Sequence, residues 1–381
     1  MKKNFDTPAL RKTAADIQGA VVPKSITPDM VGGLFSALVE AQGEVIEALG
    51  ALEREVVTVK VNGYDGDGRV STAGAKVYVD IFSIGSVPTV ALPRQELTAN
   101  EEGIVTFEVF KGYQYAVFSK LEGYGASFQF SYEACQDVRN IELWNMPIGV
   151  YMCGYVGYYN EEDESCRGVP FVTDAFETEY YDTPITMWDA KDGEIVDDAG
   201  YIGILVATED TSFIIEPQTR SSEYLTWAGN SYYGKLVPTL PAFFLIADGD
   251  WEAAQELARN DFDGNLNTAK IRSYCRSAKA AEYCTDEQAN NLAQRFLPSA
   301  GQLYLMYLNK VAINKLVSAA SDEGWEFDAI DGDYYWSSSQ FDEFCAWFVN
   351  MGDGYTSDDR KFNHLVCARR VRFSFHILGF K

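Results

Sequence analysis

The chain has 381 residues, of which 47% are hydrophobic and 14% aromatic, so its length and composition suit two or three domains with cores of their own. Its formal net charge of −25 comes without clusters of lysine and arginine, which excludes the basic surface that nucleic-acid binding needs. We therefore expect a globular protein that binds no nucleic acid.

Cysteine usage and hydropathy limit the cellular compartments and the kinds of site that the sequence suits. The seven cysteines are scattered without a Cys-x-x-Cys pair, and their odd number favours free thiols over a disulfide framework or a zinc site. No apolar run has the length of a membrane-spanning helix, and the start, MKKNFDTPALRKTAADIQG, lacks the apolar core of a signal peptide. We expect a chain that is made in the bacterial cytoplasm and does not insert into a membrane.

The first expected element is a helix in the segment TPDMVGGLFSALVEAQGEVIEALGALEREV. Thr27 suits the N-cap, and Pro28 suits the first helical position. Apolar residues step by three and four, as in a coiled coil, at Val31, Leu34, Leu38, Ala41, Val45, Ala48 and Leu52. We predict that residues 1–54 form an oligomerisation or docking region, with a homotrimer as the expected assembly. The alternative is an amphipathic helix packed on its own domain.

From Val56 the hydrophobic period changes to two, in runs separated by turns such as NGYDGDG and ANEEG. The runs are VVTVKV, AKVYVDIF, IVTFEVF, YQYAVFSK and SFQFSYE. They predict an all-β sandwich over residues 55–146. Their order resembles immunoglobulin-like (Ig-like) modules of the carboxypeptidase-regulatory kind, which implies a spacer or adhesion module.

The remainder of the chain, residues 147–381, mixes both periods. Strand patterns open it, in GVYMCGYVGYY and GYIGILVATEDTSFIIEP, and another closes it, in RRVRFSFHIL. The helical patterns between them are DWEAAQELARND, NTAKIRSYCRSAKAAEYC and SAGQLYLMYLNKVAINKLVSAA. Strands that bracket helices and long loops predict an α+β domain.

Motifs that would indicate catalysis or metal binding are absent. The sequence contains no phosphate loop, no dinucleotide glycine motif, no HExxH and no GxSxG. With His364 and His376 as the only histidines, a catalytic triad or a two-histidine metal site is hard to build. The segment NDFDGNLNT fails the register of a calcium loop and instead predicts a turn into a helix capped at Asn267 or Thr268. We expect a protein that is not an enzyme and holds no cofactor and no metal.

Two blocks in the C-terminal part carry a family resemblance. RFLPSAGQLYLMYLNKVAINKLVSA, followed by YYWSSSQ, AWFVNM and VRF, resembles the C-type-lectin-fold variable proteins of diversity-generating retroelements, of the Bacteroides and phage type. The resemblance covers residues 147–381. It implies a C-type lectin fold, shared with formylglycine-generating enzymes, that binds variable targets without catalysis. The calcium-dependent sugar signatures of animal C-type lectins are absent, so the fold implies no sugar specificity.

The resemblance also implies a variable region at about residues 336–372, in which scaffold and ligand-binding positions alternate. In these systems template adenines are copied to random bases, so AAC or AAT codons become NNY codons. Such codons cannot encode Gln, Glu, Trp, Met or Lys. In this stretch those residue types are Gln340, Trp347, Met351 and Lys361, all at positions that suit the scaffold, and Glu343, which does not lie at a scaffold position. The implied scaffold includes Trp336, Trp347 and Gly354, among Trp, Ser, Ala, Val and Gly residues that we expect to be buried or turn-forming.

The implied ligand-binding positions are all compatible with NNY codons, and we expect them to share one exposed face. Aromatic rings there would be unfavourable in water without a partner, and aromatic residues mixed with small polar ones are typical of antibody paratopes. The set consists of Phe341, Asp342, Phe344, Cys345, Phe348, Gly352, Asp353, Tyr355, Ser357, Asp358, Asp359, Arg360, Phe362, Asn363, His364, Leu365 and Cys367.

The sequence is best interpreted as a multidomain receptor-binding adhesin: a coiled-coil-like N-terminal helix, an Ig-like sandwich and a C-type lectin fold. We expect it in a virion, as a phage tail or fibre protein, with a variable protein or glycan receptor on a bacterial surface as partner. The alternative is a bacterial cell-surface or pilus-associated lectin-fold adhesin. A remote alternative is an enzyme of the formylglycine-generating type, for which Cys345 and Cys367 are the only thiol pair in the right stretch.

Overall fold

The structure is a computed structural model, in which the chain separates into two compact units, Met1–Glu55 and Val56–Lys381. The predicted N-terminal helix lies outside the described residues, so the trimer stays a prediction. The second unit contains both the predicted sandwich and the predicted α+β domain. The residues that the structure describes are 54–63, 70–82, 93–111, 113–127, 130–133, 140–160, 165–173, 185–186, 194–215, 221–275, 277–285, 295–322, 327–363 and 371–372.

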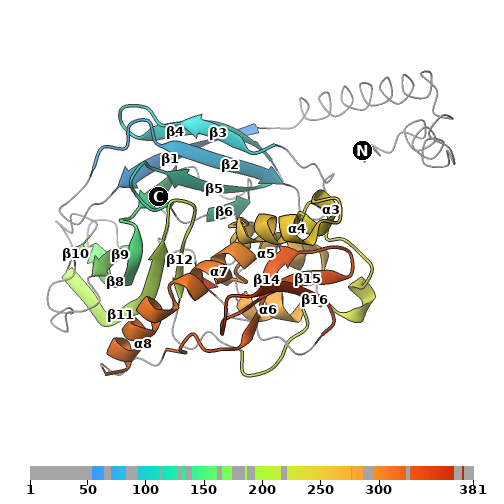
Figure 1. The fold of residues 1–381 in the computed structure, drawn as a ribbon. Helices are drawn as coiled ribbons and strands as arrows, with labels where there is room; N and C mark the ends of the chain where they lie inside the picture. The colour runs from blue at the N-terminus through green and yellow to red at the C-terminus, as the bar shows by residue number, and fades with distance from the viewer. Residues whose placement is uncertain are drawn as a thin grey trace, which may run out of the picture. The chain divides into compact units, whose positions relative to one another are not determined.

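The first seven strands form two small sheets, which agrees with the period of two in the sequence (Figure 1). One sheet has the order β4-β1-β7, from β1 (Arg54–Gly63), β4 (Ile104–Phe110) and β7 (Asn140–Asn145). The other has the order β3-β2-β5-β6, from β2 (Lys76–Phe82), β3 (Gln95–Thr98), β5 (Gln114–Lys120) and β6 (Phe130–Glu133). All five predicted runs contain strands, whereas β3 and β7 are additional.

The core of this part follows from strand alternation. In β4, Val105, Phe107 and Val109 are buried and the residues between them are not. In β5 the burial is continuous from Tyr115 to Ser119, so both faces of this strand are covered. The all-β character of the segment is therefore confirmed, while its likeness to Ig-like modules stays a prediction.

The largest sheet gathers strands from distant parts of the chain, in the order β10-β9-β8-β11-β12-β17-β13. The short strand β17, close to the end of the chain, pairs antiparallel with both β12 and β13. The chain thus returns, at Val371–Arg372, to a sheet that begins near residue 149. Its members are β8 (Gly149–Asn160), β9 (Ser165–Thr173), β10 (Ile185–Thr186), β11 (Glu194–Ala207), β12 (Ser212–Ile215), β13 (Arg295–Phe296) and β17 (Val371–Arg372).

Apart from the short helix α3, which was not predicted, the helices of the second half lie where the helical patterns predict them, with interruptions. They are α3 (Phe243–Ile246), α4 (Trp251–Arg259), α5 (Gly264–Tyr274), α6 (Lys279–Cys284), α7 (Ala300–Leu308) and α8 (Lys310–Asp322). The predicted cap of α5 at Asn267 or Thr268 is wrong: the helix begins at Gly264, and both residues are buried inside it. Thr268 satisfies its hydroxyl by donating to the Gly264 carbonyl at 2.7 Å, so the helix interior accommodates it.

A third, three-stranded antiparallel sheet completes the unit, from β14 (Tyr334–Gln340), β15 (Cys345–Asn350) and β16 (Thr356–Arg360). The helix α7 contacts β14 and β15, and α4 contacts β16 (Figure 1). The protein is therefore multidomain, built from small β-sheets with helices in its second half. Within the described residues, none of the helices combines the length and the apolar character that crossing a membrane requires.

Candidate functional site

The β14–β16 sheet holds the predicted scaffold residues in the interior of the protein. Trp336 and Trp347 are fully buried, and Trp347 meets the ring of Phe341 edge-on at 5.0 Å between centroids. The Trp336 indole N–H donates to the Leu225 carbonyl at 2.8 Å. A second indole, from Trp227, donates to a carbonyl of β14 at 2.7 Å. The expected burial of the scaffold is therefore confirmed at these positions, as it is at Ser337, Ser338, Ala346 and Val349.

Gly354 occupies its position for two physical reasons. Its φ of +75° lies in the left-handed region that side chains disfavour. A Cβ atom at this position would also lie 2.3 Å from Cε1 of Tyr307, on α7. The turn between β15 and β16 thus needs glycine to reach its conformation against the helix, as predicted.

Four of the five residues in this stretch that NNY codons cannot encode are buried, as expected for scaffold positions. Gln340, Trp347 and Met351 are fully buried, and Lys361 is 1% exposed. These are residues that NNY codons cannot encode, and each contributes to the support of the sheet. Glu343, the fifth of these residues, is half-buried.

Phe341 departs from the prediction, because it belongs to the core rather than to an exposed surface. It is 6% exposed, and its ring stacks on Phe244 at 4.5 Å as well as contacting Trp347. The reason is its place directly after β14, where the chain still runs beneath α3. The expectation of an exposed Phe341 was therefore wrong.

The other predicted ligand-binding positions that the structure describes are exposed or half-buried. Phe344 is 40% exposed and Tyr355 49% exposed, and Gly352, Asp353 and Arg360 are also exposed. Three predicted positions, His364, Leu365 and Cys367, lie outside the described residues. The half-buried positions are Asp342, Cys345, Phe348, Ser357, Asp358, Asp359, Phe362 and Asn363.

The expectation that these positions share one face was wrong. Asp358 lies opposite Trp347, and Ser357 lies opposite Phe348, on adjacent strands. Since successive side chains of a strand point to opposite sides, Asp358 and Arg360 lie on one side of the sheet and Ser357 and Asp359 on the other. A run of consecutive positions in a strand cannot form a single face.

Three rings gather at one end of the sheet, and we call Tyr233, Phe344 and Phe362 the aromatic patch. The Tyr233 ring lies 5.1 Å from that of Phe344 and 5.0 Å from that of Phe362, between centroids. Phe344 precedes β15 and Phe362 follows β16, and the N–H of Lys361 donates to the Phe344 carbonyl at 3.0 Å. Tyr233, which is 39% exposed, was missed by the sequence reasoning, because it is distant in the chain and carries no motif.

Lys361 fixes the loops beneath the aromatic patch. Its ammonium group donates to Gln340 Oε1 at 2.9 Å and to the carbonyls of Lys235 and Glu343 at 3.0 and 3.3 Å. It also lies 5.2 Å from the centre of the Trp227 ring. Burial lowers the pKa of Lys361 to about 8. One buried side chain thereby joins the segments that carry Tyr233 and Phe344.

Tyr355 lies in the turn at the opposite end of β15, apart from the aromatic patch. Its ring stacks on Trp251, the first residue of α4, at 6.2 Å between centroids. The Trp251 indole donates to Asp358 Oδ1 at 3.2 Å. The predicted ligand-binding residues therefore divide into two exposed groups rather than one.

Cys345 does not have the character of a reactive thiol. Burial, together with the negative charges of Asp342 and Asp358, raises its pKa to about 12. Because the thiolate is the nucleophile, a cysteine in this setting reacts slowly near neutral pH. The other member of the predicted thiol pair, Cys367, lies outside the described residues.

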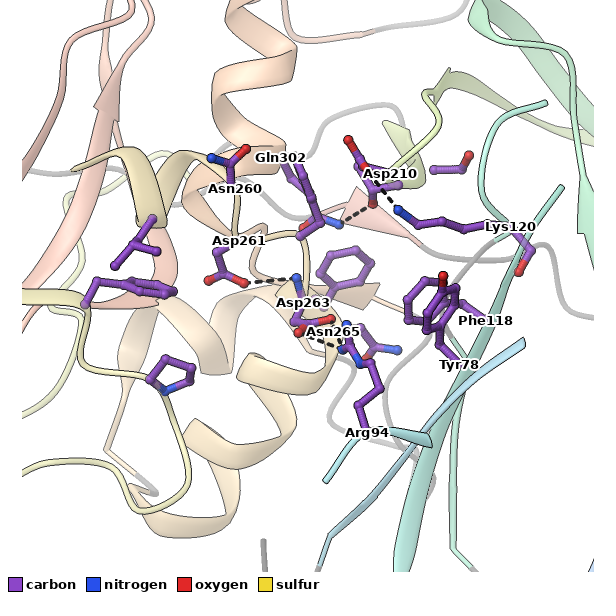
Figure 2. A pocket seen from close by; sticks show the side chains of 18 residues that line it. Tyr78, Arg94, Phe118, Lys120, Asp210, Asn260, Asp261, Asp263, Asn265 and Gln302 are labelled. Atoms are coloured by element: carbon purple, nitrogen blue, oxygen red, sulfur yellow. Dashed lines mark hydrogen bonds and ion pairs between the residues drawn. The ribbon is translucent and has the colours of Figure 1, made fainter. Parts of the chain in front are cut away.

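A cavity of about 500 Å³ is a second candidate site, which the sequence reasoning did not find (Figure 2). Residues of β2 and β5 line one side of it, and residues of the α4–α5 segment line the other. Arg94 pairs with Asp80 at 2.8 Å and with Asp263 at 2.9 Å, so it connects the two sides. Across the cavity, Lys120 pairs with Asp210 at 2.6 Å.

Asp261 borders this cavity, but its carboxylate is engaged in the protein itself. Oδ2 accepts from Ser339 at 2.5 Å and from Asn267 at 2.8 Å, and Oδ1 accepts from the N–H of Asp263 at 3.1 Å. Burial, with the charge of Asp263, raises the pKa of Asp261 above its ordinary value. Its role is to join the α4–α5 loop to β14. Among the described residues, no group of three or more His, Cys, Asp and Glu is arranged to hold a metal ion.

Comparison with known proteins leaves the family open. No protein-family model and no curated protein matches the chain. Similar solved structures include a fimbrial protein from Bacteroides ovatus, 9% identical with a TM-score of 0.29, covering 84% of this chain and 99% of that one. The shaft pilin SpaA from Lactobacillus rhamnosus GG is 12% identical with a TM-score of 0.19, covering 45% and 91% respectively. The major pilin T-13 from Streptococcus pyogenes is 9% identical with a TM-score of 0.16, covering 47% and 87%.

These three proteins are fimbrial or pilin proteins by description. Their TM-scores, between 0.16 and 0.29, lie well below the level at which a shared fold could be argued. The likeness therefore assigns neither a fold nor a function to this chain, and the functional argument rests on the site geometry.

Proposed function

We propose that the chain is an adhesin that binds a macromolecular receptor on a bacterial surface through the aromatic patch. The observation that carries this proposal is the grouping of Phe344 and Phe362 around Tyr233, whose ring lies 5.1 and 5.0 Å from theirs, with Tyr233 and Phe344 close to 40% exposed. Large aromatic side chains dominate the binding energy of protein interfaces, where they supply contact area at low entropic cost. An exposed group of them is unfavourable in water unless a partner covers it.

The loop that carries Phe344 is preorganised for such binding. Asp342 Oδ1 accepts from the N–H groups of Phe344 and Cys345, both at 2.7 Å, which shapes the turn between β14 and β15. The ammonium group of Lys361 donates to the Glu343 carbonyl in the same loop. A rigid loop loses little conformational freedom on binding, so more of the contact energy appears as affinity.

We further propose that this domain has the C-type lectin fold and that its exposed positions are diversified by a retroelement. The support is the contrast between fully buried Gln340, Trp347 and Met351, which NNY codons cannot encode, and the exposed or half-buried positions, which they can. The test is the DNA beside the gene. A near-repeat of the 3′ end that differs only at adenines, next to a reverse transcriptase gene, is the expected finding. Identical repeats, or none, would remove the diversification and leave a fixed adhesin.

Two settings would use such an adhesin: a bacterial cell surface, with or without a pilus, and a phage tail. Immunogold labelling of the producing bacteria and of any phage particles they release distinguishes the settings. Label on cells or pili supports the first, and label at the end of phage tails supports the second. Label in the cytoplasm alone would contradict both.

The binding proposal is tested with the purified full chain on a panel of whole bacterial strains. We expect saturable binding to at least one strain and a loss of at least about tenfold in affinity when Phe344 and Phe362 are both replaced by alanine. Val311→Ala is the matched control, because it removes a 72% exposed apolar side chain from α8. Equal binding by the double variant and the control would overturn the assignment of the aromatic patch.

A further inference from the structure

The cavity of Figure 2 has the size and the walls of a small-molecule site. Its volume of about 500 Å³ falls within the range of ligand pockets and suits a ligand of one or two sugar rings. Its walls come from chain segments more than a hundred residues apart, yet Arg94 pairs with Asp263 across it at 2.9 Å. The two walls differ in chemistry, and this difference indicates the class of ligand.

One wall is aromatic. Tyr78 on β2 and Phe118 on β5 lie directly opposite each other in the strand register. Their rings stack with 5.0 Å between centroids and 17° between planes, and Arg94 lies 5.2 Å over the Phe118 ring. Figure 2 shows both rings on the strand side of the cavity. Stacked rings cover each other's inner faces, and Phe118 is only 7% exposed beneath Arg94, so the half-buried Tyr78 ring is the apolar surface against which a ligand can pack.

The opposite wall is polar. Asp263, the N-cap of α5, and Asn265, in its first turn, face the strands in Figure 2. Gln302 on α7 completes this side, with its amide nitrogen 3.1 Å from the hydroxyl of Thr211. Carboxylates, amides and hydroxyls together offer both donors and acceptors of hydrogen bonds.

The two cations in the lining, Arg94 and Lys120, are both paired with carboxylates. Arg94 is held between Asp80 and Asp263, and Lys120 is held by Asp210. An anionic ligand would therefore have to compete with carboxylates that are already in place, and a purely apolar ligand would leave polar groups without hydrogen bonds. A neutral ligand with many hydroxyl groups meets neither obstacle.

Donors remain for such a ligand. The hydrogen bonds of Arg94 to the described residues use Nε and Nη2, so its Nη1 is left for a ligand. Lys120 uses its ammonium group for one hydrogen bond, to Asp210. Both side chains are about one-third exposed, so a ligand entering the cavity can reach them.

We propose that this cavity binds a neutral saccharide of one or two rings. The apolar face of the sugar packs on the ring of Tyr78, which Phe118 supports from behind. Its hydroxyl groups exchange hydrogen bonds with Arg94, Lys120 and the polar wall. This site is separate from the aromatic patch, so the chain would carry two binding functions on one unit.

The test uses the full chain on a microarray of neutral and acidic mono- and disaccharides, followed by calorimetric titration of each sugar retained. We expect retention of at least one neutral sugar. Tyr78→Ala should weaken its binding at least about tenfold, whereas Tyr78→Phe, which keeps the ring, should stay within about threefold. Circular dichroism of both variants checks that they fold.

Other outcomes would overturn the proposal. They are retention of no sugar, retention of acidic sugars alone, and equal binding of the neutral sugar by Tyr78→Ala and the natural chain. If Tyr78→Ala fails to fold, Arg94→Met takes its place, and unchanged sugar affinity in that variant is equally contradictory. Phe344→Ala separates the two sites, because it should weaken adhesion to cells and leave the sugar affinity unchanged.

Discussion

The two outer strands of the three-stranded sheet, β14 and β16, share the partner β15 and yet differ in almost every other respect. In β14, YYWSSSQ, every residue after the first is buried. In β16, TSDDR, only Thr356 is buried. Neighbouring strands of one small sheet can therefore be under opposite constraints, one of packing and the other of solubility.

The difference arises from what covers each strand. β14 receives contacts on both sides: the N–H of Ser338 donates to the Pro298 carbonyl at 2.8 Å, Ser339 donates to Asp261, and α5 and α7 pack against the strand. β16 contacts α4 and ends in Asp358, Asp359 and Arg360. Charged residues on an outer strand hinder pairing with other chains, so they suit this place. We expect β14 to be intolerant of substitution and β16 to be tolerant of it.

The largest effect should come from Trp336→Ala on β14. Trp336 is fully buried, and its truncation removes an aromatic core side chain, which lowers the free energy of unfolding by about 3–5 kcal/mol. The matched control is Ser357→Ala on β16, because Trp336, Phe348 and Ser357 form one row across the sheet. Urea unfolding of both variants measures the difference. Similar losses in the two would show that the strands are equally constrained.

The turn between β15 and β16 should respond next. Gly354→Ala combines a φ of +75° with a Cβ atom 2.3 Å from Tyr307, and we expect a loss of about 2 kcal/mol in the free energy of unfolding. Gly352→Ala, two residues earlier in the same turn, is the control, since the nearest atom to its Cβ, at 3.0 Å, belongs to the side chain of Asn350. Thermal unfolding of both variants shows whether the loss is specific to Gly354 or follows any glycine-to-alanine change in this turn. An unaffected Gly354→Ala would mean that Tyr307 moves aside freely.

Most strands and helices were predictable because each gives a hydrophobic period over a run of consecutive residues. The period of two found the strands β1, β2, β4, β5, β6, β8, β11 and β12, and the helical patterns found α4, α5, α6, α7 and α8. Short segments such as β3 (QELT) and β13 (two residues) carry too few positions for a period to appear. The division into buried scaffold and exposed positions was also predictable from residue type at Trp336, Trp347 and Gly354.

The composition of the candidate sites was less predictable, because it depends on contacts between distant segments. Tyr233 joins Phe344 and Phe362 from over a hundred residues away. Phe341 has the same residue type as Phe344, but α3 covers it. The cavity beside Arg94 depends on a pairing with Asp263, and nothing local in either segment indicates it.

The buried ammonium group of Lys361 predicts a dependence of stability on pH. Its pKa is lowered from an ordinary 10.5 to about 8 in the folded protein, so between these values the unfolded chain holds a proton that the folded protein has released. The free energy of unfolding should therefore rise with pH above 8, by roughly 1 kcal/mol per pH unit from this group. Urea unfolding from pH 7 to 9.5, compared with Lys361→Met, isolates the contribution. Parallel curves for the two proteins would show that the folded lysine keeps its ordinary pKa.

The smallest effect should come from changing several exposed positions at once. We expect Phe344→Ser, Tyr355→Ser and Arg360→Ser together to lower the free energy of unfolding by less than about 1.5 kcal/mol, since exposed positions contribute within about 0.5 kcal/mol each. Urea unfolding of the triple variant, beside Trp336→Ala, measures this. Positions that are diversified by mutation must tolerate many residue types, because each new combination has to fold before it can bind. A loss as large as that of Trp336→Ala would therefore contradict diversification at these positions, whatever the binding assays show.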